Sequence, residues 1–224
     1  MRVVSLWSGG KDSCFASYKA KQQGHRIISF INFTNADGTG SVSHGLSASI
    51  IQRQVVLIDI PFLQKAMPQK GYRDAFKALI EELKTKEGIE GIVFGDIYLQ
   101  EHRDWINKVC EELKVEPILP IWTQDTESLI KEIIGSGFKS IVVSVKRDVL
   151  GKEWLGREIN STFVKNLKAM GSIDPCGESG EFHTFVYDGP IFKKPVQFIP
   201  GKKILKNKHW FLELIPKEND KEIK

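Results

Sequence analysis

Two adjacent glycines, Gly9 and Gly10, separate a run of apolar and β-branched residues, Arg2–Trp7, from a run with helical periodicity, Asp12–Gln23. A strand that enters a helix through such a turn directs backbone N–H groups and the positive end of the helix dipole toward one point. The turn therefore predicts an anion site in an α/β fold. Its spacing differs from that of a Walker A loop, whose two glycines are not adjacent, and from Gly-x-Gly-x-x-Gly.

The side chains of this turn suit a phosphorylated ligand. Lys11 adds a full positive charge, and Ser8 and Ser13 offer hydroxyl groups. Asp12 is placed to hold a magnesium ion or to orient the start of the helix. Together these groups predict that the segment binds a pyrophosphate.

Length and composition indicate a globular protein. A chain of 224 residues, 41% hydrophobic and 27% charged, suits one large domain, or one of ordinary size and a small one. The longest apolar runs are far shorter than the roughly 20 residues that a membrane-spanning helix needs. The first residues contain no apolar segment of signal-peptide length. We therefore expect a cytoplasmic protein without a membrane span.

The cysteines and the charged residues exclude some classes of structure and function. Cys14, Cys110 and Cys176 are too far apart for a disulfide framework or a zinc site, which fits a reducing compartment. The net charge of +4 comes from basic residues spread along the chain, so nucleic-acid binding is not indicated. One local cluster of lysines runs from Lys202 to His209, and we interpret it as solvated surface rather than as a binding patch.

Short β-branched runs alternate with longer helical patterns in the first half of the chain, which predicts a parallel sheet with flanking helices. The expected strands are Arg2–Trp7, Ile27–Phe33, Val55–Ile60, Gly91–Phe94 and Glu116–Ile118. The expected helices are Asp12–Gln23, Ala48–Gln54, Gln69–Lys86 and Glu101–Leu113. The polar, glycine-rich segment from Asn35 to Ser43 is predicted to be a surface loop.

A change of pattern near Trp122 predicts a domain boundary, with one domain over residues 1–122 and a smaller α/β domain over residues 123–224 that ends in a polar tail. The elements expected in the second part are a helix Asp125–Ile134, a strand Ser140–Val145, a helix Arg157–Ala169, a turn-rich segment Asp174–Glu181, and strands near Phe182–Tyr187 and Trp210–Leu214.

Candidate site residues lie at the ends of the predicted strands. Asp96 follows Gly95 at the carboxyl end of a strand, where open α/β sheets bind ligands. His44 lies in a polar loop and Arg103 in a helix. For each of these two, a site role and an ordinary surface or capping role stay open.

The turn-rich segment carries further candidates. Glu178 and Glu181 have a spacing that in a turn can aim both carboxylates into one cleft. These acids, together with the imidazole of His183, would suit a general base or the recognition of a cationic substrate. A direct role for Cys176 stays open.

The segment Ser8-Gly9-Gly10-Lys11-Asp12-Ser13 resembles the PP-loop of the ATP pyrophosphatases. That resemblance implies a HUP/Rossmann-like domain in which the loop holds the β- and γ-phosphates of ATP. A substrate oxygen then attacks the α-phosphate, giving an adenylate and releasing pyrophosphate. ATP and Mg²⁺ are the cofactors that it implies.

A second resemblance covers roughly residues 1 to 195 and is to the diphthine–ammonia ligase family, also described as N-type ATP pyrophosphatases. The stretches that carry it are Ser8–Ser13, the region from His44 through Gln52 to Ile58–Pro61, Gly95-Asp96-Ile97 with Arg103 and Cys110, Trp154-Leu155-Gly156-Arg157, and Cys176-Gly177-Glu178-Ser179-Gly180-Glu181-Phe182-His183-Thr184. The last stretch is similar to the family signature Gly-Glu-Gly-Gly-Glu-Tyr-Glu-Thr.

The family resemblance implies an amide ligase that adenylates the carboxylate of diphthine on elongation factor 2 and transfers ammonia to it with loss of AMP. The second domain would bind this substrate, and ATP, ammonium and elongation factor 2 would be the partners; a homo-oligomer stays open. The implied nucleotide-binding residues are Ser8, Gly9, Gly10, Lys11, Asp12, Ser13, His44, Gly95, Asp96 and Arg103. The implied catalytic residues are Lys11, Asp12, Glu178, Glu181 and His183, with Asp12 also as the metal ligand.

The chain departs from the family pattern in the half expected to bind the acceptor. His183 stands where the signature has Glu, and His102 precedes Arg103 where the family has Gln. The alternatives are therefore a paralogous ligase with another carboxylate, or a PP-loop enzyme that modifies tRNA. The tRNA alternative is disfavoured because the chain has no Cys-x-x-Cys pair and no strongly basic extension. A nucleotide sensor related to universal stress proteins is a third alternative.

Overall fold

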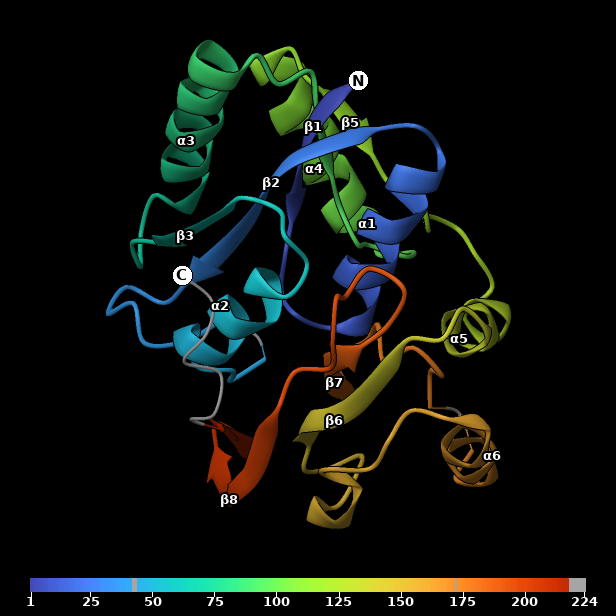
Figure 1. Cartoon of the computed structure of the whole chain (residues 1–224). Coiled ribbons are helices and arrows are strands. Elements are labelled where there is room, and N and C mark those ends of the chain that lie inside the picture. The colour runs from blue at the N-terminus through green and yellow to red at the C-terminus, as the bar shows by residue number, and fades with distance from the viewer. Residues whose placement is uncertain (42–43, 172, 218–224) are drawn as a thin grey trace.

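The computed structural model describes residues 1–41, 44–171 and 173–217 and arranges them around two sheets (Figure 1). The end of the loop expected at Asn35 to Ser43, and the polar tail beyond Lys217, lie outside the described residues. The first half consists of β1 (Arg2–Leu6), α1 (Lys11–Gln22), β2 (Arg26–Thr34), α2 (Ala48–Val56), β3 (Phe62–Ala66), α3 (Tyr72–Glu87), β4 (Gly91–Val93), α4 (Gln100–Leu113) and β5 (Glu116–Ile118). The second half consists of α5 (Thr126–Gly135), β6 (Lys139–Lys146), the short 3-10 helix η1 (Lys152–Trp154), α6 (Ser161–Ala169), β7 (Phe182–Asp188), β8 (Phe198–Lys206) and β9 (His209–Pro216).

The first sheet has five strands in the order β3-β2-β1-β4-β5, and all of its pairs are parallel. This is the doubly wound, Rossmann-like order, which confirms the predicted fold class. The chain moves from β1 outward through β2 and β3, then returns to the other side of β1 for β4 and β5. The direction therefore reverses between β1 and β4, and the carboxyl ends of these two strands flank a crevice at that point.

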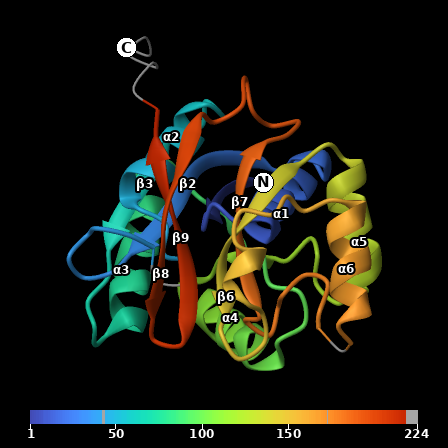
Figure 2. The same cartoon turned by 90° about the horizontal axis from the view of Figure 1, so that it is seen from below.

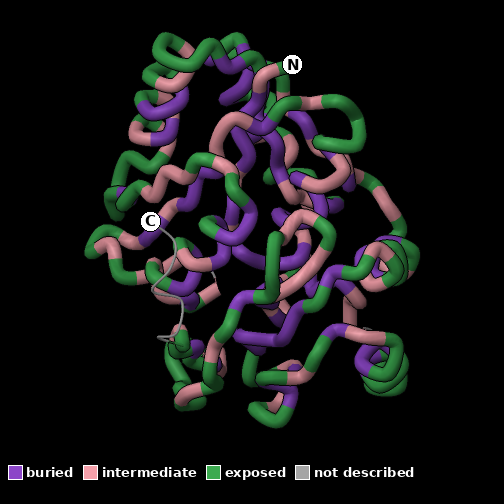
Figure 3. The backbone as a smooth tube through the Cα atoms, in the orientation of Figure 1, coloured by how far each residue is buried: buried purple, intermediate pink, exposed green. Residues whose placement is uncertain are grey.

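Alternation along β1 divides the hydrophobic core between the two faces of the first sheet. Val3 belongs to a cluster with Phe15 of α1 that continues into the second sheet. Its neighbour Val4 belongs to a second cluster with Phe76 of α3 and Val109 of α4. Figure 3 shows the resulting distribution, with buried chain along the strands and exposed chain on the outer turns of the helices.

The strand predicted over Val55–Ile60 is wrong. Residues 55 and 56 end α2, and the strand of this region is β3, which follows Pro61. This segment forms a helix rather than a strand because Ile51 and Val55 lie one turn apart and are both fully buried. Packing of this helical face therefore overrides the β propensity of two successive valines.

Two predicted helices begin later than expected. The helix predicted over Arg157–Ala169 starts at Ser161, because the Asn160 side chain accepts a hydrogen bond from a backbone N–H of the first turn and caps it there. The helix predicted over Gln69–Lys86 starts at Tyr72, after Gly71 adopts a left-handed conformation with φ of 79°.

The second sheet has four strands in the order β7-β6-β9-β8, with antiparallel pairs throughout (Figure 2). With α5 and α6 it forms the expected smaller α/β half. Strand β8 was not predicted, because its sequence contains a proline, a glycine and lysines and does not alternate between apolar and polar residues. This composition is typical of an edge strand, which is the position that β8 occupies. No helix in the described part of the chain combines the length and apolar character needed to cross a bilayer.

A buried amide joins the two halves. The Gln54 side chain of α2 accepts a hydrogen bond from Trp7 Nε1 at 2.7 Å and donates to the carbonyl oxygens of Gly9 at 3.0 Å and Val186 at 2.6 Å. The Val186 N–H of β7 also donates to the Gly9 carbonyl at 3.0 Å. The glycine turn is thus held against β7 by bonds that water does not reach.

We expect Gln54→Leu to lower the free energy of unfolding by about 3 kcal/mol, because a similar volume is kept while buried partners lose their hydrogen bonds. Urea denaturation followed by fluorescence measures this change. Gln52→Leu is the matched control, since Gln52 lies on the same helix and is exposed. Equal stability of the two variants would contradict a bridging role for Gln54.

Candidate active site

The glycine turn is organised by its own serines. The hydroxyls of Ser8 and Ser13 are hydrogen-bonded at 3.0 Å, Gly10 N donates to Ser8 Oγ at 3.2 Å, and Ser13 Oγ donates to the Gly10 carbonyl at 3.1 Å. No side chain caps α1 at Gly10. The positive end of the helix dipole therefore lies at the turn, and the acidic residue of the first turn is Asp12, whose carboxylate is paired with Lys11.

Glycine is required at positions 9 and 95 for steric reasons. Gly9 has φ of +82°, and a Cβ there would lie 2.4 Å from Ile51 Cδ1. A Cβ on Gly95, after β4, would lie 2.9 Å from Ser13 N, which is backbone and cannot move aside. The end of β4 therefore lies directly against the start of α1.

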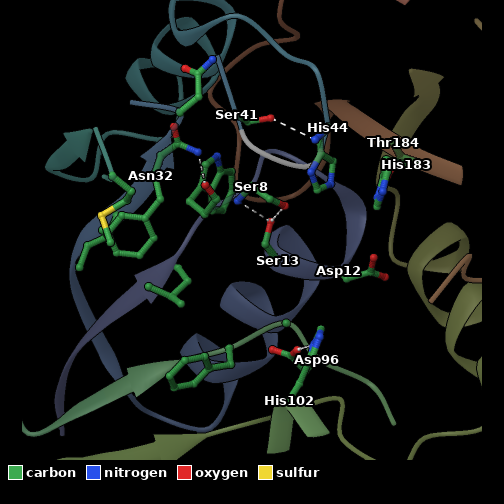
Figure 4. Close-up of a pocket in the computed structure, with 18 of the residues that line it drawn as sticks. Ser8, Asp12, Ser13, Asn32, Ser41, His44, Asp96, His102, His183 and Thr184 are labelled. Carbon is green, nitrogen blue, oxygen red and sulfur yellow. Dashed lines mark hydrogen bonds and ion pairs between the residues drawn. The ribbon is translucent and has the colours of Figure 1, made fainter. Parts of the chain in front are cut away.

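A cavity of about 780 Å³ opens at the reversal point of the first sheet (Figure 4). Predicted site residues that line it are Ser8, Lys11, Asp12, Ser13, His44, Gly95, Asp96, Glu178 and His183. In Figure 4 the serines of the turn lie between the His44–His183 pair and the Asp96–His102 pair. Residues from both halves of the chain thus form one cavity.

Lys11 is 2% exposed and points at the second half of the chain. Its Nζ donates to Asp12 Oδ2 at 2.9 Å and to the Cys176 carbonyl, and it lies 5.3 Å from the centre of the Phe182 ring. Burial alone would lower the pKa of Lys11, but the charge of Asp12 and the groups around Cys176 outweigh it, so the pKa is raised. The ammonium group therefore stays charged.

One carboxylate oxygen of Asp12 is available to bind a ligand. Burial raises its pKa, and the charge of Lys11 opposes that rise. Its Oδ1 is buried and has no hydrogen-bond partner among the described residues. Magnesium accepts one or two carboxylates together with water and substrate phosphates, so this oxygen fits a magnesium ligand. In residues 1–41, 44–171 and 173–217 no cluster of three acidic, His or Cys side chains forms a metal cage of its own.

Glu178 faces the same cavity from the glycine-rich segment. Its Oε1 accepts a hydrogen bond from Ile97 N at 2.9 Å, which ties this segment to the loop after β4. Burial raises the pKa of the Glu178 carboxyl to about 7, and the nearby charges of Asp12 and Asp96 add to the rise. A carboxyl group with such a pKa can take up and release a proton near neutral pH.

His44 and His183 form a pair of uncharged imidazoles. Their ring centres are 4.6 Å apart. Burial lowers the pKa of His44 well below its usual range, and His183 and Lys11 lower it further. Burial also lowers the pKa of His183 to about 4, with Lys11 and His209 contributing. Both rings are therefore neutral at pH 7, as two imidazoles beside an ammonium group must be.

Four predicted site residues do not line the cavity. Gly9 and Gly10 form the turn, and a Cβ on Gly10 would lie 2.8 Å from His44 Nε2. Arg103 places its guanidinium group 5.4 Å from the centre of the Trp122 ring. Glu181 accepts a bond from Asp174 N at 3.4 Å, and its other oxygen is buried without a partner in the described part of the chain. Site roles for these residues stay predictions.

Other residues of the site were not predicted. Thr184 accepts a hydrogen bond from Lys11 N at 3.0 Å, and Asn32 donates to the Trp7 carbonyl at 2.7 Å. His102 bonds to Asp96 at 2.8 Å. Asn32 could have been found as an amide side chain within an otherwise apolar strand. Thr184 could have been found because it ends the family signature. The apolar wall of the cavity comes from Leu6, Ile31, Phe33, Met67 and Phe94.

Family comparison agrees with this geometry. A profile described as "Diphthamide synthase N-terminal domain" matches residues 1–117, and one described as "Diphthamide synthase C-terminal domain" matches residues 125–219. The chain belongs to the diphthamide synthase family. The predicted family is thus confirmed, and with it the prediction of a ligase.

Several curated members of this family named diphthine–ammonia ligase, all from vertebrates, are similar over most of their length. The mouse protein is 28% identical over 221 residues, which cover 88% of this chain and 82% of that protein. The zebrafish protein is 27% identical over 222 residues, which cover 88% and 86%. A solved structure described as a predicted subunit of tRNA methyltransferase from Methanocaldococcus jannaschii aligns with a TM-score of 0.47 at 17% identity, over 88% of this chain and 100% of that one. We draw no conclusion from that alignment.

The raised pKa of Glu178 predicts a pH dependence of stability. Between about pH 4.5 and about 7 the folded protein keeps a proton on this carboxyl that the unfolded chain has lost, so stability falls as the pH rises through this range. Urea unfolding across the range should show a steeper fall for the wild type than for Glu178→Gln. The exposed-site variant Glu111→Gln should keep the wild-type slope, and an unchanged slope in Glu178→Gln would contradict the raised pKa.

Proposed function

We propose that this ligase uses ATP to adenylate a carboxylate, releases pyrophosphate, and transfers ammonia to the activated carbonyl with loss of AMP. One observation carries the proposal. The Ser8–Ser13 loop, which suits the pyrophosphate half of ATP, the proton-exchanging carboxyl group of Glu178 and the neutral imidazole of His183 face the same cavity. Activation of a carboxylate and attack by a nitrogen nucleophile would therefore occur in one place.

The cavity is divided in a way that suits ATP. The apolar wall around Phe33 and Met67 offers a surface for adenine, and the N-terminus of α1 with Lys11 offers a positive field for the phosphates. Lys11 would stabilise the negative charge that develops on the departing pyrophosphate. Asp12 Oδ1 would hold Mg²⁺, which supplies further neutralisation of phosphate charge when bound.

The other groups suit the nitrogen nucleophile. The Glu178 carboxylate can accept a proton from ammonium, which leaves ammonia with a lone pair. That nitrogen attacks the carbonyl carbon of the acyl-adenylate, AMP departs with the bridging oxygen and its electron pair, and the new amide nitrogen releases a proton to water. Neutral rings at His44 and His183 would not repel the incoming ammonium.

The curated relatives, which are named for diphthine and ammonia, support a specific acceptor. We propose diphthine on elongation factor 2 as the acceptor, which would place the reaction in the cytoplasm. We further propose that residues 1–122 form the ATP-binding domain and residues 123–224 the substrate-binding domain. Because His183 stands where the family signature has Glu, the experiment must also test another carboxylate as the acceptor.

The proposal predicts AMP, pyrophosphate and amidated diphthine from ATP, ammonium and elongation factor 2 that carries diphthine. Lys11→Met and Asp12→Asn should each slow pyrophosphate release by about 100-fold or more, because each removes charge at the phosphates. Lys21→Met, on an exposed position of the same helix, is the control and should keep wild-type rates. Thermal melting of each variant separates loss of chemistry from loss of fold.

Two results would go against the proposal. AMP formed with a small carboxylate but never with diphthine would move the protein to a paralogous ligase. Pyrophosphate release that survives both substitutions would remove the assignment of Ser8–Ser13 as the phosphate loop.

A further inference from the structure

Strand β8 leaves one long edge of the second sheet uncovered. It is the last strand in the order β7-β6-β9-β8 and pairs only with β9. Seven of its nine residues are exposed, from Ile199 to Lys206 with only Gly201 shielded. Its outward backbone N–H and C=O groups are available to an added strand. Figure 2 shows this strand (red) at the margin of the second sheet.

The turn of the β8–β9 hairpin lies beside the active-site cavity. Arg147 N donates to the Lys208 carbonyl at 2.9 Å, and Lys146 N donates to the Glu181 carbonyl at 2.9 Å. The end of β6 thus connects the hairpin turn to the glycine-rich segment that carries Glu178. Lys206 also interacts electrostatically with Asp37, and residues next to Asp37 on its loop line the cavity. A partner on this edge would be held next to the cavity mouth.

The hairpin carries a concentrated positive charge. We name as the basic edge the exposed lysines 202, 203, 206 and 208. Within the described residues none of these four ammonium groups forms an ion pair, in contrast with Lys77, Lys86 and Lys131, which pair with glutamates on the helices. A second copy of this chain paired through β8 would bring lysines against lysines. Charge therefore favours an acidic occupant over self-association.

The apolar residues of the edge favour a protein over a nucleic acid. Ile204 is 50% exposed and Leu205 is 43% exposed. They are successive residues of one strand, so they present apolar surface on opposite faces of the sheet, where the alternate side chains of an added strand would lie. The edge has no arginine and no exposed aromatic side chain, which are the groups that bind phosphates bidentately and stack on bases.

We propose that the basic edge binds an acidic, extended segment of the protein that carries the acceptor carboxylate, and thereby presents that carboxylate to the cavity. The inference rests on the proposed function only in taking the acceptor to be a protein. It reverses the sequence-based interpretation of the lysine cluster as solvated surface, because the fold places the cluster on an open strand edge beside the catalytic groups.

Lysines on an edge strand have another established use, which is to prevent aggregation through that edge. The two roles predict different results when the charges are reversed. A docking role predicts weaker binding of the acceptor. A purely protective role predicts unchanged acceptor binding, because glutamates facing glutamates would still keep two copies of the edge apart. The experiment must therefore measure acceptor binding directly.

The test compares the triple variant Lys203→Glu, Lys206→Glu, Lys208→Glu with the control Lys21→Glu, Lys108→Glu, Lys165→Glu, which makes the same change of charge at exposed positions of three helices. The probe is elongation factor 2 carrying diphthine. We expect the dissociation constant and the KM for this protein to rise about tenfold or more in the hairpin variant, with kcat and the KM for ATP unchanged. Ile204→Ser with Leu205→Ser should also weaken binding, without a change of charge.

Binding is measured apart from turnover, so the two proposals can fail separately. Charge-dependent binding without amidation would retain the docking edge and remove diphthine as the acceptor. Acceptor binding that is absent, or equal in the hairpin variant and the control, would overturn the docking edge. So would hairpin-dependent binding of single-stranded RNA, if acceptor binding stayed at the wild-type level.

Discussion

The ammonium group of Lys11 is the point at which the two halves of this protein depend on each other. A buried positive charge is tolerated only where it is paired and hydrogen-bonded. Here the partners are the Asp12 carboxylate from the same helix and the Cys176 carbonyl from the second half. The glycine-rich segment must therefore lie over the Ser8–Ser13 turn, and Gln54 and Val186 hold the back of this turn in the matching position.

The topology of the first sheet explains why these groups surround a cavity. The reversal of strand order between β1 and β4 leaves the loops after both strands diverging at the carboxyl edge. Ser8 follows one strand and Asp96 the other, while the second half covers the gap with Glu178 and His183. The candidate phosphate-binding groups and Glu178 thus come from different halves of the chain, and the hydrogen bond from Ile97 N to Glu178 holds the two halves together at the cavity.

Much of the site was predictable because it lies in short motifs. The Ser8–Ser13 turn, Asp96 after its strand, and Glu178 and His183 in the signature all line the cavity, as the motifs indicated. Predictions failed where tertiary packing decides between local preferences. The valines at the end of α2 have β propensity but lie on a buried helical face, and β8 lacks any apolar alternation because it covers no core. The position of Arg103 in the sequence does not indicate whether its side chain faces the cavity or packs on the Trp122 ring.

The sequence by itself determined the fold class and the family, and it indicated the Ser8–Ser13 turn as a candidate phosphate loop, because these depend on the order and spacing of a few residues. The tertiary structure decided the chemical state of those residues. Glu178 is a carboxyl group like any other in the sequence, and its pKa of about 7 results from burial beside Asp12 and Asp96. Likewise, the lysines of β8 became a candidate docking edge only when the fold placed their strand at the margin of a sheet, beside the cavity. Burial and proximity are properties of segments far apart in the chain, and local sequence does not encode them.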